Sequence, residues 1–142
     1  FSFGIITTIG LISGVLSDQQ HWQRAFTIKK RDLRLSYIVA GILFNRLQLG
    51  MPLQVDAVFG YIYGRDTYSP SFADLTVDSP YNTYTHTGLP PGPIDNPGLD
   101  SIEVVLNPTK TDYLYYLTGK DNLMHYATTY AGHQANRRKY LD

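Results

Sequence analysis

The acidic side chains are the first candidates for chemistry, because a carboxyl group can donate or accept a proton. The sequence holds a single glutamate, Glu103, on a segment with a helical pattern and away from other polar clusters. A solvated helix side chain is the expected role for it. The aspartates are scattered over different elements: Asp56, Asp66, Asp74 and Asp78. Hydrolysis by two carboxyl groups requires that they face each other across the bond, and no such pair is evident.

The histidines show no metal signature. His86, His125 and His133 lack the HxH and HExxH spacings, and cysteine is absent, so we expect neither a metal nor a cofactor. His125 falls on a predicted strand. Its ring could hydrogen-bond a substrate or lie satisfied beside Tyr126, and both interpretations stay open.

Tyrosine is abundant, with 12 residues in a chain of 142. A tyrosine offers a flat apolar face and a hydroxyl, which suits stacking on sugar rings, although half-buried strand residues have the same composition. The formal net charge of zero and the pI near 7.1 exclude general electrostatic binding of nucleic acid.

A helix over residues 35–49 would position the first polar group. Apolar residues recur there at i, i+3, i+4 and i+7, and Gly50 and Pro52 end the helix. Asn45 and Arg46 lie near its C-terminal end. After it, residues 53–63 predict a short extended segment with Gln54 and Asp56 on one face, or a helix that begins after Asp56.

The remaining pattern predicts an α+β fold, in which helices pack with a small antiparallel sheet. A short helix is expected at 69–75, with Ser69 as N-cap, and an ordered proline-rich loop at 78–98. A helix at 98–106 with Leu99, Ile102, Val105 and Leu106 on its apolar side follows. Strands at 111–118 and 124–128 flank a turn, and a helix at 129–141 ends the chain.

Residues 1–16 are apolar and uncharged, but shorter than the roughly 20 residues that span a bilayer. A truncated membrane segment, a buried helix and sequence outside the native reading frame all fit this pattern.

Two runs of residues carry a resemblance to a known family. Residues 39–56 read VAGILFNRLQLGMPLQVD, and residues 79–98 read SPYNTYTHTGLPPGPIDNPG. Leu106 to Pro108, Tyr113 to Leu117, Met124 to Tyr126 and His133 continue the pattern in order. Residues 36–141 thereby resemble the catalytic domain of the endolytic murein transglycosylases, the YceG-like family, whereas residues 1–35 do not. We expect an unmatched segment at 1–35 and this domain at 36–142.

The resemblance implies an enzyme of the bacterial cell envelope. Members cleave peptidoglycan glycan strands between N-acetylmuramic acid and N-acetylglucosamine without water, which leaves 1,6-anhydromuramyl ends and terminates nascent strands. It also implies peptidoglycan synthases as partners. The expected location is the bacterial inner membrane, through an anchor outside the matched region, with the catalytic domain on the extracytoplasmic side.

This sequence departs from the family at the catalytic acid. The family supplies one glutamate that acts as acid and then as base, and the matching position falls near Lys29. A lysine has a pKa near 10.4 and no carboxylate, so it cannot replace that group. The chain is then an inactive member, or its first third is out of frame or wrongly joined, or another residue supplies the acid, with Asp56 the nearest candidate. The abrupt loss of similarity favours the second account.

The matched runs also imply residues that contact the glycan: Asn45, Arg46, Gln54, Asp56, Tyr81, Asn82, Thr83, Tyr84 and His125. Structural roles compete with this assignment. Asn82 and Thr83 suit turn and cap bonding to the backbone, and Arg46 suits an ion pair with Asp56 or another aspartate. The rival function is a non-catalytic module that binds glycan or a protein partner.

Overall fold

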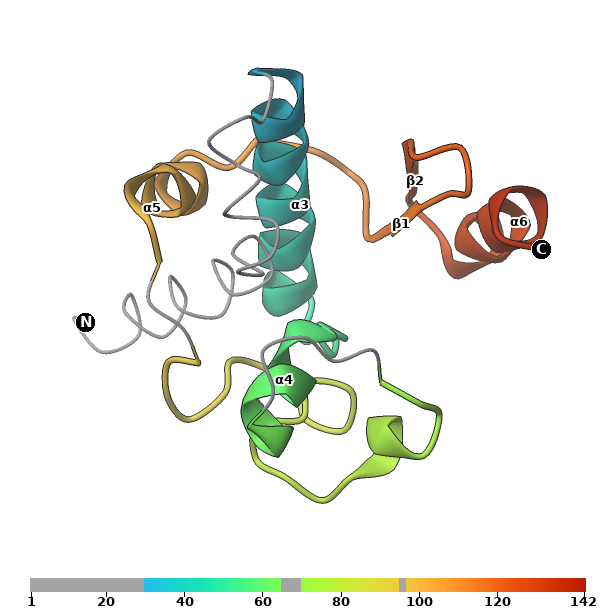
Figure 1. The fold of residues 1–142 in the computed structure, drawn as a ribbon. Helices are drawn as coiled ribbons and strands as arrows, with labels where there is room; N and C mark the ends of the chain where they lie inside the picture. Colours follow the sequence, from blue (N-terminus) through green and yellow to red (C-terminus); the bar gives the residue numbers. More distant parts are fainter. Residues whose placement is uncertain (1–29, 65–69, 95–96) are drawn as a thin grey trace.

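A computed structural model describes residues 30–64, 70–94 and 97–142 (Figure 1). Its elements are α3 (Lys30–Gln48), α4 (Ala57–Tyr63), the 3-10 turn η1 (Asp74–Thr76), α5 (Leu99–Leu106), β1 (Tyr115–Thr118), β2 (Met124–Ala127) and α6 (Tyr130–Tyr140). The α+β fold is therefore confirmed. The apolar segment 1–16, Lys29 and the N-cap predicted at Ser69 lie outside the described residues.

The central helix is α3, which begins at Lys30, before the predicted start. Gly50 ends it in the left-handed conformation, with φ of 65°, and the Met51 amide returns to the Arg46 carbonyl oxygen. In Figure 1, α3 stands between α5 and the β1–β2–α6 unit. Its position allows it to organise both sides of the domain.

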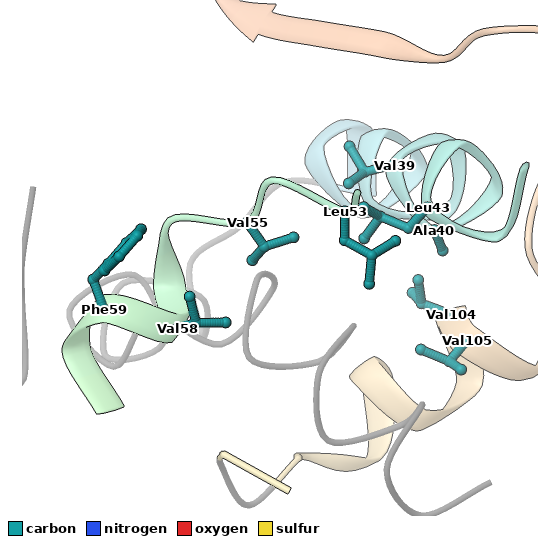
Figure 2. Close-up of a cluster of buried hydrophobic side chains, with 9 residues drawn as sticks. All are labelled: Val39, Ala40, Leu43, Leu53, Val55, Val58, Phe59, Val104 and Val105. Atoms are coloured by element: carbon teal, nitrogen blue, oxygen red, sulfur yellow. The ribbon is translucent and has the colours of Figure 1, made fainter. Parts of the chain in front are cut away.

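The core gathers around one face of α3. Figure 2 shows Val39, Ala40 and Leu43 of α3 facing residues from the segment after it, from α4 and from α5. The full set of buried members is Val39, Ala40, Leu43, Leu53, Val55, Val58, Phe59, Val104 and Val105. Burial of these aliphatic side chains is the main favourable contribution to the fold.

Residues 53–56 alternate as predicted, although they form no regular strand. Leu53 and Val55 are buried, whereas Gln54 and Asp56 are exposed. Gln54 has a φ of 54°, which interrupts an extended conformation. The helical alternative after Asp56 is confirmed by α4.

The short helix predicted at 69–75 is wrong for its described part. Residues 70 and 71 have no regular structure, residues 72 and 73 form a turn, and η1 begins only at Asp74. The cause is a side chain that bonds to the backbone in place of a helical turn. Asp74 Oδ2 accepts from both the amide and the hydroxyl of Ser71, each at 2.7 Å.

Helix α5 begins after Gly98 as predicted, but its apolar side is different. Leu99 and Leu106 are 80% and 63% exposed, whereas Ser101, Val104 and Val105 are buried. Because α5 meets α3 through a narrow stripe at i, i+3 and i+4, apolar residues at the two ends of α5 fall outside the contact.

Strands β1 and β2 form the predicted antiparallel hairpin, with Tyr116 opposite Tyr126 and Leu117 opposite His125. One face of the hairpin packs on α6. On the other face, Tyr116 and Met124 contact the core. Helix α6 begins after Thr129, whose side chain accepts from the Gly132 amide. None of the helices in the described residues has the length and apolar character needed to cross a membrane.

Residues 111–114, predicted as strand, are irregular instead. They run along α3, where Asn45 and Arg46 take the carbonyl groups of Thr111, Tyr113 and Leu114. The Leu114 amide still donates to the Ala127 carbonyl oxygen at 3.0 Å, but the engaged carbonyl groups leave residues 111–114 outside the regular ladder, and β1 begins at Tyr115.

Candidate functional site

The two runs that carried the family resemblance lie against each other. The Gln54 amide donates to the Thr83 carbonyl oxygen at 3.0 Å, and the Val55 amide donates to the Thr83 hydroxyl at 2.9 Å. An isolated antiparallel bridge joins Pro52 and Thr87. The segment after α3 and the proline-rich loop therefore build one surface.

Asp56 and Tyr84 are the centre of this surface. The Tyr84 hydroxyl donates to Asp56 Oδ1, and the Tyr84 ring packs on Phe59 with centroids 5.9 Å apart. Burial, followed by the hydrogen bond and the charge of Asp56, raises the pKa of Tyr84. The pair presents an exposed carboxylate and a neutral phenol, which together can bind sugar hydroxyl groups.

Tyr116 adjoins this pair, and the sequence analysis did not assign it to the site. Burial raises the pKa of Tyr116 to about 12, with opposite influences from the charges of Arg46 and Asp56. The electrostatic effect of Tyr116 also raises the pKa of Tyr84. The period-2 alternation of the strand places Tyr116 on the face opposite Tyr115 and Leu117. That alternation was available in the sequence, but the proximity to Asp56 was not.

Arg46 lies beneath the site and is 6% exposed. Its guanidinium donates to the carbonyl oxygens of Leu114 at 2.7 Å, Leu53 at 2.8 Å and Pro52 at 3.1 Å. The group also lies over the Tyr115 ring, 5.0 Å from its centroid. The expected ion pair with Asp56 or another aspartate does not occur among the described residues. Burial lowers the pKa of Arg46.

Asn45 holds the chain entering β1. Its side-chain amide donates to the carbonyl oxygens of Thr111 at 2.6 Å and Tyr113 at 3.2 Å. Asn45 and Arg46 thus join α3 to the hairpin, and in this structure their polar atoms are engaged with the backbone.

Asn82 and Thr83 follow the structural interpretation. Asn82 is fully buried; its side chain donates to the Leu75 and Val77 carbonyl oxygens and accepts from the Tyr84 amide. Thr83 is 2% exposed and bonds to Val55. These two residues shape the loop that presents Tyr84.

Tyr81 belongs to a neighbouring aromatic pair. Its ring lies 4.7 Å from that of Tyr61 on α4, and a hydrogen bond to Tyr61, followed by burial, raises the pKa of Tyr81. Gly92 leaves room for the Tyr81 hydroxyl, because a Cβ there would lie 3.1 Å from it.

His125 is separated from Asp56 and Tyr84 by the hairpin. It lies on the face packed against α6, where its ring stacks on Tyr140 at a centroid distance of 3.4 Å. Its Nε2 contacts Asp121 Oδ2 at 3.0 Å. The structure therefore brings together most of the predicted contact residues, but not His125.

The remaining candidates are Glu103 and the side chains that could bind a metal. Glu103 is exposed on α5 and lies beside Tyr37 of α3. Burial raises the pKa of Tyr37, and the charge of Glu103 raises it further. Within the described ranges, no three His, Cys, Asp or Glu side chains converge as a metal site would require.

These features define a small α+β domain with a polar face that carries a carboxylate and tyrosine hydroxyl groups. The model of the YceG-like family matches residues 34–139, and the chain belongs to this family.

The chain is similar to proteins named endolytic murein transglycosylase. It is 43% identical over 103 residues to the one from Bacillus subtilis strain 168, which covers 72% of this chain and 29% of the relative. The one from Streptococcus pneumoniae D39 is 37% identical over 111 residues, covering 74% and 20%. The crystal structure of a YceG-like protein from Listeria monocytogenes aligns with a TM-score of 0.66 at 42% identity, covering 70% and 33%. The chain thus spans a third or less of the relatives it matches.

Proposed function

We propose that the chain contributes the glycan-binding face of an endolytic murein transglycosylase. In this function, the bond between N-acetylmuramic acid and N-acetylglucosamine is cleaved without water, and nascent glycan strands are terminated. The observation that carries the proposal is the pairing of Asp56 with Tyr84 on a surface built by the two matched runs. An exposed carboxylate and a phenol provide the acceptors and donors that sugar hydroxyl groups require.

The reaction requires one carboxyl group that changes roles. As an acid it protonates the glycosidic oxygen, and the C–O bond breaks. As a carboxylate it then takes the proton of the C6 hydroxyl, whose oxygen closes on C1. Such a group retains its proton near neutral pH when apolar surroundings raise its pKa. Asp56 is exposed and accepts a hydrogen bond from Tyr84, so its carboxylate lies among solvent and a phenol and can accept hydrogen bonds from sugar hydroxyl groups.

A second candidate is a non-catalytic module that binds glycan or a protein partner. The position of Glu103 favours it. Glu103 is the only glutamate, and it lies near Tyr37, whereas the Asp56 surface adjoins Arg46. Tyr37 and Arg46 lie nine positions apart on α3, which is about 13.5 Å along the helix axis.

The location and partners belong to the same proposal. We place the domain on the extracytoplasmic side of the bacterial inner membrane, held by an anchor outside the matched region, with peptidoglycan synthases as partners. The location and the synthase partners follow from the family resemblance, whereas the names of the relatives contain only the word murein.

The test incubates the 142-residue chain with purified glycan strands and measures two quantities. Mass spectrometry detects anhydromuramyl ends, and co-sedimentation measures binding. Cleavage with binding supports the transglycosylase, and binding alone supports the second candidate. If the folded chain does neither, both are wrong.

Two variants assign the acid. Lys29→Glu restores the carboxyl group that the family resemblance implies, and Asp56→Asn removes the nearest alternative. Anhydromuramyl ends that appear only with Lys29→Glu would identify the chain as a binding scaffold that lacks its acid. Ends that appear with the unmodified chain and disappear with Asp56→Asn would assign the acid to Asp56.

A further inference from the structure

A row of tyrosines continues from Asp56 across the hairpin. It consists of Tyr84, Tyr116, Tyr126 and Tyr113, and we call it the tyrosine row. We propose that the tyrosine row binds consecutive sugar units of a glycan strand beyond the unit held at Asp56. This inference rests on the proposed function and extends the same site to a defined length of oligosaccharide.

The contacts between neighbours establish the row. Tyr84 bonds to Asp56, and Tyr84 and Tyr116 both pack against the same hydrophobic core cluster. Tyr116 pairs with Tyr126 across the strands, so both side chains leave the same face of the hairpin. The Tyr126 ring stacks on Tyr113, with centroids 5.2 Å apart and planes 20° apart. These contacts join the hairpin tyrosines to one another and place Tyr84 and Tyr116 on a common core.

The face that carries the row is open to solvent in part. Helix α6 packs on the other face, where its residues Tyr130 and His133 contact Tyr115. Tyr84, Tyr116 and Tyr126 are half-buried, and Tyr113 is 39% exposed. Each ring thus combines a fixed edge with accessible surface.

The backbone that bears the outer end of the row is fixed by α3. The Asn45 side-chain amide donates to the Tyr113 carbonyl oxygen, and the Arg46 guanidinium donates to that of Leu114. A ring on a fixed backbone loses less conformational entropy when a ligand binds. The row is therefore a preorganised surface.

The chemistry of the row favours a neutral sugar. A phenol with its ordinary pKa is already uncharged at neutral pH, and burial raises the pKa of Tyr84, Tyr116 and Tyr126 further. Aromatic faces suit the C–H faces of sugar rings, and the hydroxyl groups suit their polar edges. The Arg46 guanidinium is buried and bonded to carbonyl groups, so it is not accessible to a polyanion.

The test measures affinity against ligand length with the full chain. The probes are oligomers of N-acetylglucosamine from the dimer upward, titrated by calorimetry. We expect the affinity of the unmodified chain to rise with length. Tyr113→Ala should lose about tenfold in affinity for the longest oligomer, equivalent to one well-made ring contact, and nothing for the dimer. Tyr113→Leu should recover part of the loss, which separates surface contact from folding.

Tyr130→Ala is the matched control. Tyr130 is 58% exposed and lies on α6, behind the hairpin. The Tyr130→Ala variant should bind every oligomer with the affinity of the unmodified chain. If Tyr113→Ala also binds every oligomer unchanged, the tyrosine row is wrong while the proposed function stands. A folded, unmodified chain that binds no oligomer overturns both.

Discussion

The hydroxyl of Tyr84 donates a hydrogen bond to the carboxylate of Asp56, although 28 positions separate the two residues. The loop bonds of Asn82 and Thr83 set this pairing, because they fix the backbone that leads into Tyr84. Within the described residues, this pair links the two matched runs through side chains that remain accessible to a ligand.

The first prediction concerns the titration of Tyr84. Asp56 raises the pKa of Tyr84 through its hydrogen bond and its charge, in addition to the larger effect of burial. Asp56→Asn should therefore lower the pKa of Tyr84, since removal of the negative charge makes the phenolate easier to form. The ultraviolet absorbance of phenolate, followed against pH, measures this change. The double variant Asp56→Asn, Tyr84→Phe identifies which tyrosine moves, and an unchanged curve would contradict the pairing.

The second prediction concerns Arg46. Arg46→Lys keeps the charge but cannot reach three carbonyl oxygens in two separate segments. We expect it to lower the free energy of unfolding by about 3 kcal/mol, since charged hydrogen bonds are lost and a buried ammonium remains. Urea denaturation measures the change. Arg138→Lys, on the exposed part of α6, should be neutral within about 0.5 kcal/mol.

The third prediction concerns Gly41, where the chain after α5 crosses α3. A Cβ at this position would overlap the Thr109 carbonyl oxygen, and the Thr109 amide is bonded to Tyr37. Gly41→Ala should therefore destabilise the fold by about 2 kcal/mol despite its better helix propensity. Gly132→Ala in α6 is the control, because its Cβ would lie 3.3 Å from its nearest neighbours. Equal melting temperatures for the two variants would contradict the close approach of the Thr109 carbonyl oxygen to Gly41.

The fourth prediction concerns pH and His133. Its Nδ1 is buried and has no hydrogen-bond partner in the described part of the chain, and its ring stacks on Tyr115. Burial, then the charges of Arg137 and Arg46, lower the pKa of His133 below 6.5. The unfolded chain therefore binds this proton at higher pH than the folded chain. The stability contribution is complete above pH 6.5 and is lost as the pH falls through the folded pKa.

His133→Phe preserves a ring against Tyr115 and removes the titration. The free energy of unfolding of this variant should depend less on pH between about 5 and 7 than that of the unmodified chain. His86→Phe, at an exposed histidine, should keep the original slope. An identical slope for all three proteins would show that His133 is not the group responsible.

Local patterns were sufficient for the main elements. The apolar period of α3 and the hairpin turn involve neighbours in the sequence, so their interactions were visible before the structure. The errors occur where distant groups compete for the backbone. Residues 111–114 do not form the predicted strand, because their carbonyl oxygens accept hydrogen bonds from Asn45 and Arg46, which lie 66 or more positions away.

In the candidate site, too, the sequence indicated the residues but not the contacts between distant segments. Asp56 and Tyr84 were both expected on the contact surface, since the matched runs contain them. Their hydrogen bond could not be predicted, because it depends on how the proline-rich loop returns to α4. Tyr116 was missed for the same reason, and His125 was included because a strand position alone does not reveal which face meets α6.

The attachment of residues 111–114 to α3 also sets an order of folding. The bonds from Asn45 to Thr111 and from Arg46 to Leu114 close chain segments of 66 and 68 positions. The β1–β2–α6 unit closes through much shorter separations, and short loops form faster. We therefore expect contacts within the β1–β2–α6 unit to form before the unit docks on α3, and docking to complete the polar surface.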